Sequence, residues 1–143
     1  MKAIALVSSL CLLAACEPVD FAKRNELSLV ERAAAVDTLR LNAAALNAGD
    51  LDALERTIDE NSPLFEDAVH SAQATIARYG PTVGIRDVRL VSEKRGELVL
   101  GYVQTIAVAR GHLPFSAAQV ETTLVRGRTG WAVSSTRVLS LKP

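Results

Sequence analysis

The sequence predicts a single α+β domain in which three helices pack on one face of a curved, four-stranded antiparallel sheet. Two patterns lead to this class. Apolar residues recur at helical spacing between Leu29 and Tyr79, and from Val83 onward they alternate with a period of two. Helices that all precede the strands are typical of an α+β layer fold. With 143 residues, the chain can bury one core of ordinary size but not two.

Residues 1–16 have the pattern of an export signal. Lys2 supplies a positive start, and residues 3–13 are apolar apart from two serines. This run is too short to span a bilayer and is typical of a signal-peptide core. It ends in Leu13-Ala14-Ala15-Cys16, which is a bulky aliphatic residue, two small residues and a cysteine.

This tetrapeptide resembles the lipobox of bacterial lipoproteins. The resemblance implies that the Cys16 thiol is joined to diacylglycerol, that the chain is cut before Cys16, and that the new amine is acylated. Cys11 is a poorer candidate because the large Leu10 precedes it. We therefore expect a signal peptide over residues 1–15, a lipidated tether over 16–27 and the folded domain over 28–143. The alternative is an ordinary secretory signal that contains a cysteine by chance.

The anchor would place the protein in the bacterial cell envelope, facing the periplasm, with the outer membrane favoured. More than one acyl chain makes such anchoring stable. The processed domain contains no cysteine, so it must be stable without a disulfide. The formal net charge of the chain is zero and no block of like charge occurs, which argues against a nucleic-acid-binding protein.

Capping residues divide the helical part of the chain into three. Ser28, followed by Glu31, predicts a capping box before a first helix that ends at Gly49. Asp50 can cap a short second helix. Ser62-Pro63 suits the start of a third helix, which Gly80-Pro81 closes.

Four strands are expected at about residues 84–92, 97–109, 115–126 and 131–140. They are connected by three-residue turns at Lys94-Arg95-Gly96 and Gly111-His112-Leu113, and by a two- or four-residue turn around Gly127-Arg128. These turns pair Leu90 with Leu100, Leu100 with Leu124, and Leu124 with Trp131. The larger apolar side chains then share one face, and a slip of one residue would break this arrangement.

Two stretches resemble the nuclear-transport-factor-2-like superfamily, which includes the SnoaL-like cyclases. One is the helix end Leu46-Asn47-Ala48-Gly49-Asp50-Leu51, and the other is the last hairpin, where Gly130-Trp131 opens the final strand. The resemblance covers about residues 28–140 and implies a cystatin-like cone of helices on a curved sheet. Members often carry a short strand pair between the second and third helices, which we do not find in this sequence. The superfamily includes isomerases, dehydratases, cyclases and non-catalytic adaptors, so function must be argued from the site.

Five polar side chains are candidates for a pocket on the concave face of the sheet: Tyr102, Gln104, Thr122, Ser135 and Arg137. Several donors and one cation in an otherwise apolar cone suit a small anionic or carbonyl-bearing ligand. The alternative is that Tyr102 and Gln104 are core residues bonded to backbone and that Arg137 reaches solvent.

The resemblance also implies that catalytic members carry an Asp or His in the pocket as a general base. The predicted register places neither on the concave face of any strand. Asp37 or Glu66 would serve only if its helix turned it inward. His70 and His112 have no carboxylate or cysteine at ligand spacing, so neither a metal nor another cofactor is expected.

Three functions fit these features. The first is a membrane-anchored envelope lipoprotein whose non-catalytic domain binds a small molecule or takes part in an assembly. The second is an enzyme of the SnoaL or ketosteroid-isomerase type that acts on a small carbonyl compound. The third is a structural subunit of an envelope complex, with a protein partner or a second copy on the outer face of its sheet.

Replacing Cys16 by Ala removes the thiol that the lipobox assigns to the lipid. We expect the Cys16→Ala chain to take up no labelled fatty acid and to retain residues 1–15, as measured by labelling in cells and by mass spectrometry. Cys11→Ala is the control and should be labelled normally. Normal labelling of Cys16→Ala would refute the anchor.

Overall fold

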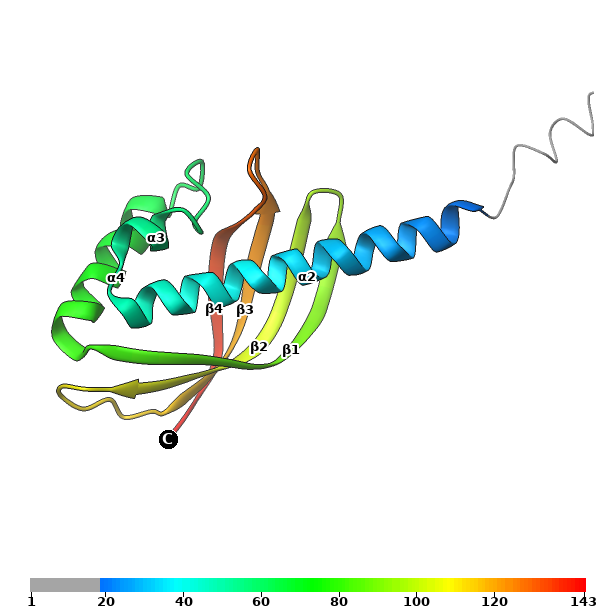
Figure 1. The fold of residues 1–143 in the computed structure, drawn as a ribbon. Coiled ribbons are helices and arrows are strands. Elements are labelled where there is room, and N and C mark those ends of the chain that lie inside the picture. The colour runs from blue at the N-terminus through cyan, green and yellow to red at the C-terminus, as the bar shows by residue number, and fades with distance from the viewer. Residues whose placement is uncertain (1–18) are drawn as a thin grey trace, which may run out of the picture. The chain divides into compact units, whose positions relative to one another are not determined.

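The computed structural model describes the backbone of residues 19–143 and the side chains of residues 29–143, so Cys16 and the predicted signal peptide lie outside it. Within this range, three helices precede four strands: α2 Val19–Ala48, α3 Leu51–Glu55, α4 Phe65–Tyr79, β1 Pro81–Lys94, β2 Glu97–Val108, β3 Ala117–Arg126 and β4 Trp131–Lys142. The strands form one antiparallel sheet in the order β1-β2-β3-β4, and its concave side faces α3 and α4 (Figure 1). The predicted fold class is confirmed. None of the described helices combines the length and the apolar character needed to cross a bilayer.

Helix α2 begins at Val19, so Ser28 lies inside the helix and the predicted capping box is wrong. Residues 19–27, predicted as part of a tether, are helical. They have no apolar period, but Ala, Lys, Arg, Glu and Leu favour a helix without one. The predicted end is confirmed, because α2 stops at Ala48 and Gly49 takes a φ of +67°. Residues 33–48 belong to the same compact unit as the sheet.

The caps of the two shorter helices are partly as predicted. The Asp50 carboxylate accepts a hydrogen bond from the Ala53 N–H at 2.9 Å and caps α3, as expected. Helix α4 begins at Phe65, later than the predicted start at Ser62-Pro63. The Ser62 hydroxyl instead donates to the Ser134 carbonyl at 2.9 Å, so it ties this segment to β4.

The segment between α3 and α4 also extends the edge of the sheet. The Val133 N–H donates to the Thr57 carbonyl and the Asp59 N–H donates to the Val133 carbonyl, each at 2.8 Å. These bonds form a parallel bridge between Ile58 and Val133, which the sequence pattern did not predict. The first half of β4 is therefore covered at its outer edge.

The first hairpin pairs Leu90 with Leu100 as predicted, although its turn and the first strand differ from the prediction. Its turn has two residues rather than three, because Lys94 pairs with Glu97, and Gly96 takes a φ of +74°. A bulge in β1 between Leu90 and Ser92 supplies the extra residue. The shorter turn and the bulge shift the register in opposite directions, so the predicted pairing is kept.

The second connection shifts the pairing of β2 with β3 by two residues. Leu98 pairs with Leu124 and Leu100 with Thr122, so the predicted pairing of Leu100 with Leu124 is wrong. The cause is a longer loop, residues 109–116, in place of a three-residue turn. Because the shift is an even number, every side chain keeps its predicted face.

The last hairpin contains the shift that matters for the site. Leu124 pairs with Val133, so the predicted pairing of Leu124 with Trp131 is wrong. Thr123 pairs with Ser135, so β4 carries one extra residue between these two pairs. This bulge reverses the alternation of faces from Ser135 to Val138, and a second irregularity at Leu139 shifts the register again. Thr136, predicted on the outer face, therefore pairs with the buried Thr122, and Arg137 pairs with Glu121 on the outer face.

The core lies between residues 33–48 of α2 and the sheet. Leu39 packs on a sheet cluster that includes Leu98, Leu100, Leu124 and Trp131, each at most 8% exposed. Ala35, which is fully buried, has no bulk beyond its Cβ and lets the helix backbone approach the strands closely. The predicted concentration of large apolar side chains on one face is confirmed.

Replacing Leu124, which is fully buried, by Ala should lower the free energy of unfolding by about 3 kcal/mol, because the cavity is walled by other core side chains. Leu41→Ala is the matched control. Leu41 is 63% exposed on α2, so its loss should change stability by at most about 0.5 kcal/mol. Urea denaturation of both variants measures the difference, and equal destabilisation would contradict this core.

Candidate functional site

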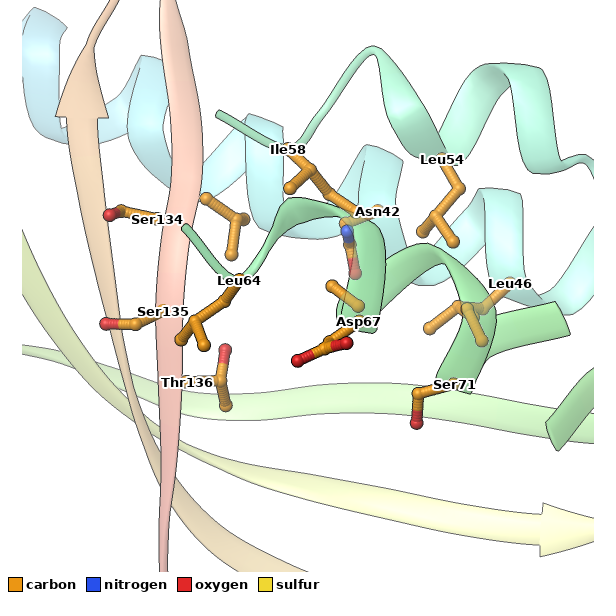
Figure 2. Close-up of a pocket in the computed structure, with 13 residues that line it drawn as sticks. Asn42, Leu46, Leu54, Ile58, Leu64, Asp67, Ser71, Ser134, Ser135 and Thr136 are labelled. Atoms are coloured by element: carbon orange, nitrogen blue, oxygen red, sulfur yellow. The ribbon is translucent and has the colours of Figure 1, made fainter. Parts of the chain in front are cut away.

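A cavity of about 500 Å³ opens between α4 and β4, and its floor includes residues of α2 and α3 (Figure 2). Most of its wall is apolar. The apolar residues come from every helix and from β4: Leu46, Leu54, Ile58, Leu64, Ala68, Ala72 and Val133. Such a wall, with a few polar groups placed on it, is typical of small-molecule sites.

The polar groups that line this first cavity are one carboxylate, one amide and four hydroxyls. Figure 2 shows the Asp67 carboxylate projecting from α4 toward β4, on the side where Thr136 lies. The Asn42 amide nitrogen donates to the Thr57 hydroxyl at 2.8 Å, which leaves the Asn42 carbonyl oxygen as the free acceptor. Ser71 adds a hydroxyl from the next turn of α4.

A second cavity, of about 460 Å³, lies farther along α4. Its wall is formed by the end of α4, the start of β1, the end of β2 and the loop that follows β2. The large apolar residues on this wall are Tyr79, Val83, Ile106, Val108, Leu113 and Phe115. Gln104 and Thr75 are polar but uncharged, so no charged side chain lines this cavity among the described residues.

Helix α4 leaves these cavities open because it is held at its ends. None of its side chains is fully buried. At its carboxyl end, the Arg110 guanidinium donates to the Ile76 and Ala77 carbonyls at 2.8 and 3.0 Å. A cation that also satisfies the last carbonyls is a favourable cap. At its other end, Ser62 ties the preceding segment to β4.

A chain of three hydroxyls leads from the core to the first cavity. The Tyr102 hydroxyl lies 2.8 Å from the Thr122 oxygen, which lies 3.0 Å from the Thr136 oxygen. Burial raises the pKa of Tyr102 above 10.0, an effect partly opposed by its bond to Thr122, so Tyr102 is a neutral donor at pH 7.

The donor in each of these two hydrogen bonds can be assigned from the number of partners that each hydroxyl has. Thr122 is the one partner of the Tyr102 hydroxyl among the described residues. A buried O–H that donates to nothing is costly, so Tyr102 donates to Thr122. Thr122 then donates to Thr136, and the Thr136 proton is free to point into the cavity. Thr136 is therefore a donor on the cavity wall.

The five side chains predicted for one pocket do not share one, although Tyr102 contacts Thr122 and both Ser135 and Arg137 line a hollow on the outer face. Tyr102 and Thr122 are buried and line neither cavity, whereas Gln104 lines the second. Ser135 borders the first, but Figure 2 shows its hydroxyl on the other side of β4 from Asp67. The predicted inward position of Arg137 is wrong. Its guanidinium contacts the Glu121 carboxylate on the outer face, because the β4 bulge reverses the faces.

The acid that the cavity contains is not one that the sequence suggested. Asp37 pairs with Arg40 at 3.5 Å on the exposed side of α2, and Glu66 is exposed on α4. Asp67 is also an exposed residue, but it is the acid that lines the cavity. The cavity-lining face of α4 has helical spacing but consists mainly of small or polar residues, which hid it from a search for apolar periods: Leu64, Asp67, Ala68, Ser71, Ala72, Thr75 and Tyr79. In the described part of the chain, no three His, Cys, Asp or Glu residues are grouped to hold a metal.

A scan of protein-family models gives no match to the sequence, and a search of curated proteins gives none either. Solved structures do share the fold. An NTF2-like protein with a cystatin-like fold from Novosphingobium aromaticivorans has a TM-score of 0.60 at 14% identity, covering 86% of this chain and 89% of that one. A proposed aromatic ring hydroxylase from the same organism has a TM-score of 0.66 at 12% identity, covering 80% and 92%.

A proposed dehydratase of the NTF2-like family, from Streptomyces avermitilis, has a TM-score of 0.56 at 14% identity, covering 71% of this chain and 88% of that one. Identities this low establish the fold and carry no function. The fold expected from the sequence resemblance is confirmed: the domain has the cystatin-like fold of NTF2-like proteins, with helices on the concave side of a four-stranded sheet.

Proposed function

We propose that this chain is a membrane-anchored bacterial envelope lipoprotein whose domain binds a small, largely apolar molecule that carries a hydrogen-bond donor. One observation carries the binding part. The first cavity is mostly apolar and has one carboxylate, Asp67, while no Lys, Arg or His lines either cavity among the described residues.

This composition decides the charge of the ligand. The Asp67 carboxylate only accepts hydrogen bonds, so a ligand group beside it must donate, and the Asn42 carbonyl oxygen is a further acceptor. An alcohol or an amine does so. An anion would face the Asp67 charge with no cation to offset it. The anionic ligand expected from the sequence depended on Arg137, which binds Glu121 on the outer face instead.

The location rests on the sequence. The lipobox at Leu13-Ala14-Ala15-Cys16 supports export, lipidation of Cys16 and a position on the periplasmic side of a membrane, with the outer membrane favoured. A domain held there by its lipid would meet small molecules that enter the envelope. A protein partner or a second copy on the outer sheet face remains compatible with this role, because both cavities open on the other side.

Three compounds with the same ring and different head groups test the ligand class: cyclohexylamine, cyclohexanol and cyclohexanecarboxylate. We expect the amine and the alcohol to raise the melting temperature of the protein and the carboxylate to leave it unchanged. Saturation at 100 times Kd corresponds to about 2.7 kcal/mol of added stability. Asp67→Asn should remove most of the effect of the amine, whereas Glu66→Gln, one residue away and not part of the cavity wall, should preserve it. Stabilisation by the carboxylate alone would contradict the proposal.

A second candidate is an enzyme of the ketosteroid-isomerase or SnoaL type that acts on a small carbonyl compound. The observation that favours it is the pairing of Asp67, a possible proton acceptor, with the Thr136 donor on the opposite wall. A carbonyl that accepts from Thr136 would present its α-proton to a base in the same cavity. Two structural neighbours are named as a dehydratase and a hydroxylase, which is compatible with such chemistry in this fold.

Hydrogen–deuterium exchange at the α-carbon of cyclohexanone, followed by NMR, measures this activity directly. An enzyme would exchange the α-protons faster than buffer, and Asp67→Asn would lower the rate by about 100-fold or more. Glu66→Gln would keep it. Exchange at the buffer rate by the wild-type protein would leave binding as the function and exclude proton abstraction from this ketone.

A further inference from the structure

The two cavities are neighbouring parts of one groove under α4. They share four lining residues, Leu46, Ala68, Ser71 and Ala72. The first continues from there toward Leu64 at the start of α4, and the second toward Tyr79 at its end. The shared α4 residues are small, so no bulky side chain of the helix divides the groove. Helix α4 has 15 residues, which limits the groove it covers to about 22 Å in length.

The two ends of this groove differ in chemistry. The Asp67 end presents the carboxylate, the Asn42 carbonyl oxygen and hydroxyls. The other end presents Ile106, Val108 and Phe115 and no charged side chain. One site that is polar and anionic at one end and apolar at the other is complementary to an amphiphile with a cationic head.

The polar groups of the first cavity favour one kind of head group, a primary ammonium. A primary ammonium carries three donors and no acceptor, and it offsets the charge of a carboxylate. Asp67, Asn42 and Ser71 offer it acceptors in one cavity. An alcohol offers a single proton and brings no charge to offset that of Asp67.

We propose that the groove binds a single-chain primary amine, with its ammonium at Asp67 and its unbranched apolar tail in the second cavity. This inference rests on the proposed binding function and names its ligand class. The tail would bury apolar surface along the face of α4 that the fold leaves uncovered, and each added methylene would strengthen binding until the groove is full.

Isothermal titration calorimetry of the purified full chain with dodecylamine, butylamine and dodecanol, all below their aggregation limits, tests each part. We expect dodecylamine to bind at least about 100-fold more tightly than butylamine, because the longer tail reaches the second cavity. Dodecanol should bind at least about 10-fold more weakly than dodecylamine, because it brings no charge to Asp67.

Two pairs of variants test the contributions of the two ends of the groove separately. Thr75→Phe fills part of the second cavity and should weaken dodecylamine at least about 10-fold with little effect on butylamine. Its control, Ala74→Phe, places the same ring at an exposed neighbouring position. Asp67→Asn should weaken both amines, and its control is Glu66→Gln. Circular dichroism and melting temperature show that each variant is folded.

Three other outcomes would each overturn a stated part of the proposal. Equal affinity for dodecylamine and butylamine would overturn the two-cavity ligand while leaving the proposed function intact. Equal affinity for dodecanol and dodecylamine would overturn the ammonium. Failure of every amine and of the cyclohexyl compounds would refute the binding function itself.

A membrane lipid could supply the same head group, and a soluble lipid distinguishes that source. Dihexanoyl phosphatidylethanolamine carries the ammonium beside a phosphate, for which neither cavity offers a cation within the described residues. It should therefore not displace dodecylamine. Displacement at comparable concentration would overturn the assignment to a single-chain amine.

Discussion

Hydrogen bonds hold helix α4 at its two ends, and the candidate site depends on this constraint. Ser62 and the Ile58–Val133 bridge hold the segment before it to β4, and Arg110 holds its last carbonyls. Because these bonds position the helix, its inner face does not have to pack on the sheet. In an ordinary helix–sheet layer that packing supplies most of the stability. Here the space remains as two cavities.

The β4 bulge decides which chemistry faces that space. One extra residue between Val133 and Ser135 turns Thr136 inward and Arg137 outward. Without it, a guanidinium would stand across the groove from Asp67, and the two charges would neutralise each other. With it, Arg137 pairs with Glu121 instead and the groove has a carboxylate alone. The backbone geometry at the bulge, rather than the amino-acid composition, therefore determines that the groove carries a negative charge.

The sequence predicts the fold well and the site poorly, for separate physical reasons. The fold class can be predicted from the periodic spacing of apolar residues, because each helix and each strand must bury one face along its whole length. Register depends on loop length and on bulges, and each of these is a local event of one or two residues. The longer loop at residues 109–116 shifts the pairing by two and keeps the faces, whereas the single residue at the β4 bulge reverses them. Asp67 was missed because the face that carries it is made mainly of small and polar side chains.

Those small side chains also link stability to binding. Ala68, Ser71 and Ala72 face open space where larger residues would fill a core, so the domain lacks the contacts that the groove could have provided. A ligand that enters the groove supplies the missing contacts and is bound by them. The stability that the fold forgoes along α4 is thus recovered only in the complex. Two ends held by hydrogen bonds and a middle lined with small residues are the features that suit this helix to be the wall of the proposed binding site.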